Sequence, residues 1–194
     1  MRIRLPGVAA AAMAMLASAA PAQAAQAAQG DTKQFYVGIG FAYGIYNLSG
    51  GSVSLPSEYK DGLAYYGELG IRLKGKYGLG IEADYYARSG AIGSIDVWYY
   101  NAAARFYPSA NSNFWFKGLI GYATTSGSYF GGGGYGGSAS SDGFALGAGL
   151  GYDLHLGPTF TLVPFVQYLA QLSGSSGGYK SDLFMAGGQI AISP

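Results

Sequence analysis

Eight charged side chains of this sequence recur inside apolar segments, where isolated charge is costly. Neighbouring carboxylates such as Glu82 and Asp84 could serve as a general acid and base, but bases near both would neutralise them. The set contains four acidic and four basic residues, so its charges balance. We therefore expect these side chains to form ion pairs inside the protein, rather than a ring of one charge that would select ions. The set is Glu68, Arg72, Glu82, Asp84, Arg88, Arg105, Lys117 and Asp153.

Other residue types give little support for catalysis. His155 is the single histidine, and no serine lies in evident register with it as a nucleophile. The sequence has no cysteine, which excludes disulfides, thiolate metal sites and cysteine nucleophiles. The glycine-rich stretch from Gly131 to Gly137 lacks the Lys-Ser/Thr of a phosphate-binding loop. We expect no catalytic, cofactor-binding or metal-binding residues, and no enzyme activity.

The segments that carry the charges alternate with a period of two. From Phe35 to Tyr46, large apolar residues occupy every second position, which predicts a β-strand with one apolar face. A tilted transmembrane strand needs about 9–11 residues. Eight strands are predicted, at residues 35–46, 63–73, 77–88, 95–107, 114–124, 144–154, 160–171 and 183–192.

The two faces of the predicted strands differ in chemistry. The apolar face, with Ile81 and Leu150 among others, is expected to meet lipid, and the other face supplies small and polar residues to a lumen. Outward aromatic residues near the strand ends predict two girdles at the membrane surfaces. The periplasmic girdle is predicted at Phe35, Tyr77, Phe106, Phe114, Tyr152 and Phe160. The outer girdle is predicted at Tyr85, Trp98, Tyr100, Tyr122 and Tyr168.

The connections between the strands alternate between short and long. This asymmetry is typical of periplasmic turns and extracellular loops, although the outer connection at residues 89–94 is short. The short turns are residues 74–76, 108–113 and 155–158, and the longer loops are residues 48–62, 125–143 and 172–182.

Aromatic residues in the long loops are candidate contacts for an extracellular ligand. Tyrosine among small residues suits adaptable recognition surfaces. The alternative is a solvated loop with incidental aromatic residues. The candidates are Tyr129, Phe130, Tyr135 and Tyr179.

The N-terminus carries the features of a secretory signal. Arg2 and Arg4 precede a short apolar stretch that ends in an Ala22-Gln23-Ala24 cleavage site, and the stretch is shorter than the roughly 20 residues of a spanning helix. We expect residues 1–24 to be cleaved, residues 25–33 to be a short periplasmic lead-in, and residues 34–194 to form one barrel. Without Arg2 and Arg4, nine bases face ten acids, which argues against a nucleic-acid partner.

Composition agrees with a membrane barrel better than with a soluble domain. The sequence has 34 glycines and 18 tyrosines, and 11% of its residues are charged. The second face of the strands is too charged and glycine-rich to be the surface of a soluble β-sandwich, and a disordered chain would lack the alternating Leu, Ile, Val and Phe.

Three segments carry a resemblance to a known family. They are FYVGIGFAYGIY at residues 35–46, GLGIEADYYARSG at residues 78–90 and FALGAGLGYDL at residues 144–154. The sequence resembles the small eight-stranded bacterial outer-membrane β-barrel proteins, the porin-like and opacity-type family related to the OmpA transmembrane domain. The resemblance implies an all-β, antiparallel, up-and-down transmembrane barrel in the Gram-negative cell outer membrane. The family's last strand usually ends in an aromatic residue, whereas this sequence ends Ile190-Ala191-Ile192-Ser193-Pro194.

The turns also predict which charged residues lie next to one another. Counting from the turns places Arg105 opposite Lys117 and Glu82 about one step from Arg105.

The expected function follows from the lumen and the loops. The interior of an eight-stranded barrel is just wide enough for side chains to fill. We therefore expect a monomer in contact with outer-membrane lipids, with a structural or surface-interaction role and an extracellular partner at its loops. A small porin-like channel is the alternative, and an enzyme acting on lipid A or phospholipid is a more distant one.

Overall fold

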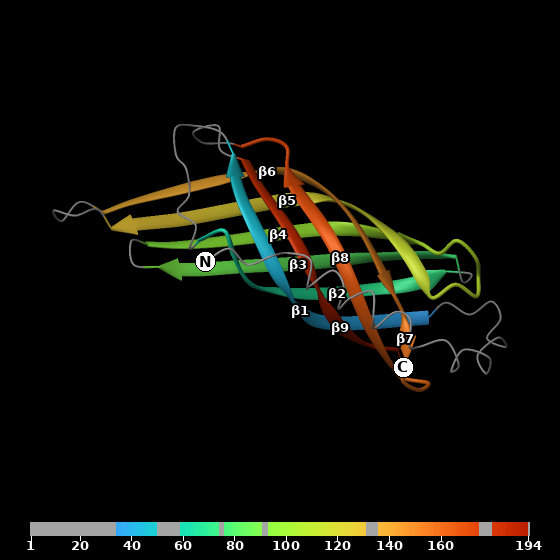
Figure 1. The fold of residues 1–194 in the computed structure, drawn as a ribbon. Helices are drawn as coiled ribbons and strands as arrows, with labels where there is room; N and C mark the ends of the chain where they lie inside the picture. The colour runs from blue at the N-terminus through green and yellow to red at the C-terminus, as the bar shows by residue number, and fades with distance from the viewer. Residues whose placement is uncertain are drawn as a thin grey trace.

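The computed structural model describes residues 34–49, 59–73, 76–90, 93–130, 136–174 and 180–193. Nearly all of them lie in β-strands (Figure 1). The strands are β1 (Gln34–Ser49), β2 (Asp61–Leu73), β3 (Tyr77–Gly90), β4 (Gly93–Phe106), β5 (Phe114–Phe130), β6 (Gly136–Tyr152), β7 (Leu154–His155), β8 (Phe160–Gln171) and β9 (Lys180–Ile192).

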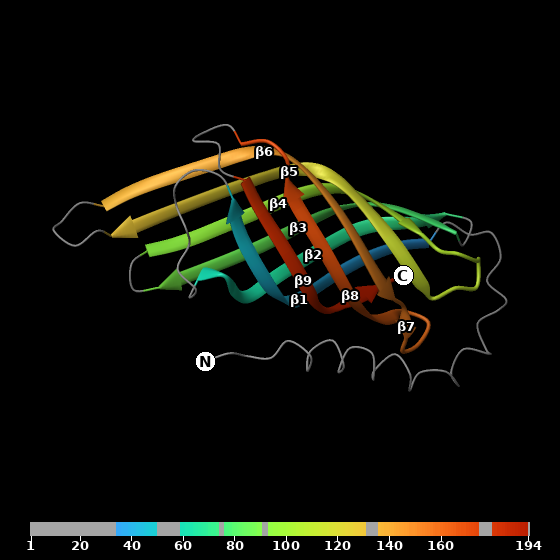
Figure 2. The same cartoon turned by 45° about the horizontal axis from the view of Figure 1, so that its top comes forward.

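The strands close into a barrel in which every pairing is antiparallel. Each strand from β1 to β6 pairs with the next one along the chain, β1 also pairs with β9, and β9 with β8. The pairing of β6 with β8 closes the ring, and Figure 2 shows the curvature of the wall. The two-residue β7 continues β6 after Asp153, so the ring has eight strands. The predicted fold class is confirmed.

The interruption between β6 and β7 has a local cause. The backbone N–H of Asp153 donates to the carbonyl of Asn113 in the β4–β5 turn, at 2.8 Å. The predicted strand at residues 144–154 is therefore broken at its periplasmic end. The predicted strand at residues 95–107 likewise ends one residue early, because the N–H of Tyr107 bonds to Lys76, at 2.8 Å.

The end of the β5–β6 hairpin that is predicted to be extracellular departs most from the prediction. Residues 125–143 were expected to form a loop, but β5 continues to Phe130 and β6 begins at Gly136, with Ser126 paired with Ser140. Serine, threonine and glycine are typical of loops. The ladder depends on backbone groups, however, and it continues while the two chains stay in register.

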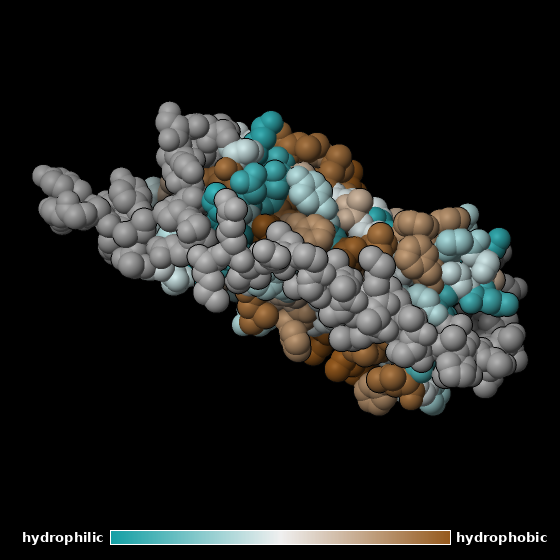
Figure 3. Space-filling view, viewed as in Figure 1, coloured by the Kyte–Doolittle hydropathy of each residue, from teal (hydrophilic) through white to brown (hydrophobic). Residues whose placement is uncertain are grey.

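The alternation of the two faces is confirmed. Ile39 is 70% exposed and Ile81 is 63% exposed on the outer face, whereas Tyr86 and Val97 have no exposed surface inside. In Figure 3 the apolar surface lies over the middle of the visible wall and polar residues gather towards the ends. None of the described residues forms a helix with the length and apolar character of a membrane span.

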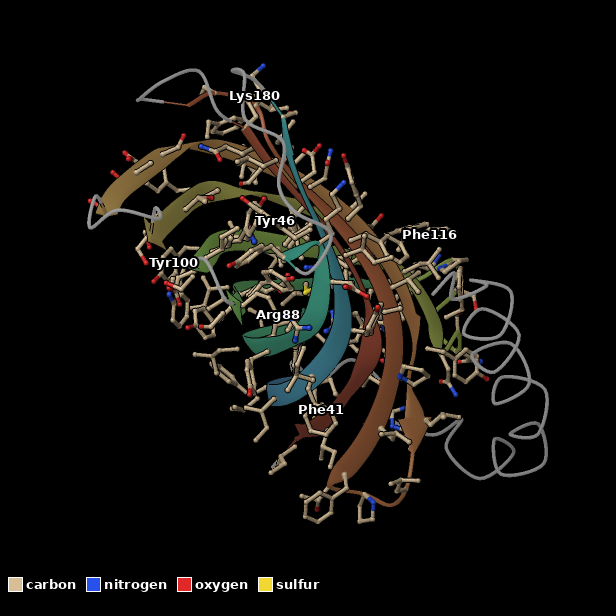
Figure 4. The ribbon with its side chains drawn as sticks, turned by 60° about the vertical axis from the view of Figure 1, so that its left-hand side comes forward. Phe41, Tyr46, Arg88, Tyr100, Phe116 and Lys180 are labelled. Carbon is tan, nitrogen blue, oxygen red and sulfur yellow. The ribbon has the colours of Figure 1, made fainter. Side chains whose placement is uncertain are left out.

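The lumen holds larger side chains than the small and polar residues that the sequence predicted. Trp115 is 1% exposed and Phe165 is 5% exposed, and Leu169 and Leu183 are fully buried. Figure 4 shows Phe41, Tyr100 and Phe116 on the outside of the wall and Tyr46 within it. Side chains therefore fill the described barrel as they fill a protein core.

Candidate functional site in the barrel lumen

Two buried ion pairs cross the middle of the lumen. Arg105 on β4 contacts Glu68 on β2 through a charge-assisted hydrogen bond, and the Lys117 Nζ on β5 lies 2.5 Å from the Glu82 Oε2 on β3. All four residues are at most 4% exposed. Since a buried charge is stable only when it is paired and hydrogen-bonded, each pair depends on both of its members.

The strand register explains why the pairs reach across the lumen. Glu68 lies directly opposite Glu82 on the β2–β3 ladder, and Arg105 lies opposite Lys117 on the β4–β5 ladder, as predicted. Like charges opposite one another on a sheet are destabilising. The two acids on β2 and β3 therefore neutralise the two bases on β4 and β5, and each ion pair skips one intervening strand.

The predicted proximity of Glu82 to Arg105 is wrong. Glu82 pairs with Asn101 on the β3–β4 ladder, and Arg105 pairs with Gly78, four positions away along β3. Gly78 has no side chain, and a Cβ there would lie only 3.3 Å from the Cβ of Arg105. Arg105 contacts Glu68, which lies two strands away on β2, rather than Glu82 on the adjacent strand.

Tyrosine hydroxyls link the two ion pairs into one network. Tyr36 donates to Glu68 at 2.6 Å, and Tyr66 also donates to Glu68. Lys117 Nζ donates to the Tyr66 hydroxyl at 3.2 Å. The Arg105 guanidinium lies 4.3 Å from the ring centre of Trp115, which adds a cation–π contact.

The third buried acid of this layer, Asp84, is held by side-chain amides. Asn101 and Gln167 each donate to its carboxylate at 3.2 Å, and Gln167 also donates to Glu82 at 2.6 Å. The sequence analysis did not select Gln167, although period two within the predicted strand at residues 160–171 places it inward. We refer to Glu68, Glu82, Asp84, Arg105 and Lys117 as the charged layer.

A second polar group lies at the periplasmic end of the lumen. Asp153, which is 5% exposed, accepts hydrogen bonds from Tyr107 at 3.0 Å and from Trp115 at 2.8 Å. The Arg72 Nη1 lies 3.8 Å from Asp153, and its guanidinium lies 3.9 Å from the Tyr107 ring centre. Burial, reinforced by the charge of Asp153, raises the pKa of Tyr107 above its usual range. The phenol therefore remains a hydrogen-bond donor.

The remaining predicted residues lie away from the charged layer. Arg88 is exposed at the outer end of β3, because the strand continues beyond the buried part of the lumen. His155 lies in β7, with its Nδ1 3.0 Å from the Thr161 hydroxyl. Within the described ranges no group of three or more His, Asp or Glu side chains could hold a metal ion.

The four loop candidates divide into two groups. The backbones of Tyr129 and Phe130 belong to β5 and pair with β6, so the prediction of a loop at these two residues is wrong. Their ladder is the extension of the hairpin noted above. Tyr135 and Tyr179 lie outside the described residues.

An apolar outer wall, polar ends and a filled, charge-paired lumen define an integral membrane β-barrel. Residues 9–164 match the family model of the outer membrane protein beta-barrel domain. The chain belongs to this family, and it is an integral protein of the Gram-negative outer membrane.

Solved structures show the same fold at low sequence identity. Neisserial surface protein A is 16% identical, with a TM-score of 0.59 over 84% of this chain and 99% of that one. Ail of Yersinia pestis, in complex with the heparin analogue sucrose octasulfate, is 16% identical, with a TM-score of 0.57 over 82% and 98%. OprG of Pseudomonas aeruginosa is 16% identical, with a TM-score of 0.50 over 84% and 97%. No sequence among curated proteins matches the chain.

Proposed function

We propose that this barrel is a surface-interaction protein that presents its β5–β6 hairpin outside the cell. The single observation that carries the proposal is the length of the hairpin. Each of its strands has 17 residues, whereas a bilayer crossing uses about 9–11. The strands therefore extend beyond Tyr122, which the sequence places in the outer girdle.

The outward face of this extension is a regular array of hydroxyl groups. Ser128 pairs with Ser94 on one side and with Ser138 on the other, and the Oγ atoms of Ser94 and Ser128 are 2.9 Å apart. Ser126 lies in the same way between Asp96 and Ser140. These six residues, with Gly127 and Ala139, line a groove of about 360 Å³.

The chemistry of this serine groove favours a neutral, hydroxyl-bearing ligand. Hydroxyl groups both donate and accept hydrogen bonds, and the single charged residue of the lining is the acid Asp96. The solved structure of Ail contains a heparin analogue. This groove does not suit such a polyanion, because its lining has no base among the described residues. We infer that a glycan surface of low charge is the partner.

The charged layer argues against the alternative of a small porin-like channel. Two ion pairs and the rings of Trp115 and Tyr66 occupy the middle of the lumen, where a conducting pore needs a continuous water-filled path. We also propose that the barrel is a monomer without enzyme activity. An unchanged lipid A mass profile when the barrel is overproduced would support the second point.

A glycan array tests the proposed function directly. Barrel in nanodiscs is applied to the array as wild type and as a variant with Ser126, Ser128, Ser138 and Ser140 changed to Ala. We expect wild type to bind neutral glycans and the variant to lose that binding. Ser109→Ala in the periplasmic turn is the matched control and should bind as wild type does. Binding that persists in the four-serine variant would contradict the proposal.

The N-terminal processing also remains a proposal. We propose that residues 1–24 are a cleaved signal peptide and that residues 25–33 are a lead-in to the barrel; both lie outside the described residues. Intact-mass analysis of barrel extracted from outer membranes should give a chain that begins at Ala25. A chain that keeps Arg2 and Arg4 would contradict the proposed cleavage.

A further inference from the structure

The four strands that run towards the cell exterior share an aromatic spacing. Each carries an outward aromatic residue near its periplasmic end and an outward tyrosine eight residues later. Eight residues span about 26 Å of strand, or about 20 Å of depth at the usual barrel tilt, which is close to the apolar thickness that a barrel presents. The pairs are Phe35 with Tyr43, Tyr77 with Tyr85, Phe114 with Tyr122, and Phe160 with Tyr168.

Three of these outer tyrosines are hydrogen-bonded to an aspartate on the next strand. Tyr85 donates to Asp96 at 2.7 Å and Tyr122 donates to Asp142 at 2.5 Å. Tyr43 donates to Asp61 in the same way. Tyr168 has Asp182 at the corresponding position of the next strand.

The four tyrosine–aspartate pairs occupy equivalent places in the ladder. In every hairpin the aspartate lies opposite the residue two positions beyond the tyrosine, and therefore slightly further from the membrane centre. The ladder partners are Ile45 with Asp61, Ala87 with Asp96, Thr124 with Asp142, and Ala170 with Asp182. We call these four tyrosines and four aspartates the Tyr–Asp belt.

The belt continues the lipid-facing wall at its outer edge. Tyr43, Tyr122 and Tyr168 are 43%, 46% and 47% exposed. Tyr85 stacks on Trp98 with ring centres 4.3 Å apart, and Trp98 stacks on Tyr100 at 5.7 Å. Aromatic rows of this kind lie at the headgroup level of a membrane, so the carboxylates just beyond them meet headgroups.

We propose that the Tyr–Asp belt binds lipid headgroups that carry a primary ammonium group. An ammonium gives charge-assisted N–H···O hydrogen bonds to a carboxylate, which are stronger than neutral ones. Each carboxylate has about four acceptor positions, and the tyrosine hydroxyl occupies one. A protein-bound divalent cation fits less well, because Mg²⁺ or Ca²⁺ takes at least six oxygen ligands and each belt position offers one aspartate.

The pair Tyr85–Asp96 is the best place to test the proposal. Arg88 lines one groove with Tyr43 and Asp61, and its positive charge would compete with a lipid ammonium for Asp61. Asp96 has no base in the described lining of its groove, and the glycan array tests that groove separately. Trp98 is 38% exposed and lies beside Tyr85, whereas Trp115, the other tryptophan of the chain, is buried in the lumen. Trp98 is therefore a local reporter of the lipids next to Asp96.

The experiment measures quenching of Trp98 fluorescence by lipids with brominated chains. Barrel is folded into mixed vesicles in which the bromine is carried either by phosphatidylethanolamine or by phosphatidylcholine, which has no N–H donor. We expect the ethanolamine lipid to be enriched beside Trp98 by roughly twofold, the size expected for an exposed charged contact. Asp96→Asn should remove the enrichment, and N-methylation of the ethanolamine should reduce it stepwise.

A matched control lies on the far side of the barrel. Asp182→Asn removes an equivalent carboxylate four strands away from Trp98 and should leave the enrichment at Trp98 unchanged. Asp96→Ala, which also removes the carboxylate, gives a second variant if Asp96→Asn does not fold, and it should also remove the enrichment.

Three results would overturn the proposal. They are equal quenching by the two lipids in wild type, an enrichment that persists in a folded Asp96→Asn or Asp96→Ala barrel, and an enrichment of phosphatidylglycerol that appears only with Mg²⁺. The last result would assign the belt to cation-bridged phosphates instead.

Discussion

The acids inside the barrel and the acids on its outer rim are held in different ways. Glu68 and Glu82 in the lumen are at most 4% exposed and each contacts a base two strands away. Asp96 and Asp142 on the rim lie beside tyrosines, whose hydroxyls donate to them. A buried carboxylate needs an opposite charge because water cannot solvate it, whereas a carboxylate at the interface keeps water and headgroups within reach. Carboxylates in the lumen therefore stabilise the fold through ion pairs, whereas we expect carboxylates on the rim to remain available for binding.

The largest effect is expected from breaking an ion pair of the charged layer. Lys117→Met leaves Glu82 buried without its base, and we expect the free energy of unfolding in vesicles to fall by about 3–5 kcal/mol. Denaturant unfolding followed by tryptophan fluorescence measures the loss. Adding Glu82→Gln to Lys117→Met should recover part of it. Strictly additive losses would show that the two residues are not coupled.

A charge on the lipid-facing wall should cost somewhat less. Ile81 is 63% exposed on the outer face, between the two girdles, so Ile81→Arg should reduce folding stability in bilayers by about 2–4 kcal/mol. Ser128→Arg, on the same outward face but beyond the predicted girdle, is the matched control and should be close to neutral. If Ile81→Arg proved equally neutral, the assignment of this face to lipid would be wrong.

The smallest stability effect is expected on the rim. Asp96→Asn keeps the size of the side chain and replaces a half-buried carboxylate with an amide that still accepts a hydrogen bond from Tyr85, so stability should change by less than about 0.5 kcal/mol. The same unfolding assay gives the comparison with Lys117→Met. A loss of several kcal/mol at Asp96 would mean that the rim acids support the fold as the lumen acids do.

The barrel and its two faces could be predicted from sequence because both depend on local alternation. Period two, as in the segment from Phe35 to Tyr46, places side chains on opposite faces whatever their partners are. The opposition of Arg105 and Lys117 could also be counted from a short turn, and the structure confirms it. The outer end of the β5–β6 hairpin could not be predicted, because a segment rich in serine and glycine can form either a strand or a loop.

The partners across the lumen depend on information that the sequence does not display. Arg105 on β4 reaches past β3 to Glu68 on β2, and ladder counting describes only adjacent strands. Gln167 is missed for the same reason, since its partners Glu82 and Asp84 lie on β3. The tyrosine–aspartate bonds are closer to prediction, because each joins neighbours within one hairpin.

Conductance across planar bilayers tests the central claim, that the charged layer closes the lumen, most directly. Wild-type barrel should conduct little at neutral pH, because side chains and ion pairs fill its middle. Arg105→Ala with Lys117→Ala removes bulk and both bases of the layer, and should open a path lined by Glu68, Glu82 and Asp84 that prefers cations. A large, steady conductance of the wild-type barrel would contradict the closed lumen and favour the channel alternative.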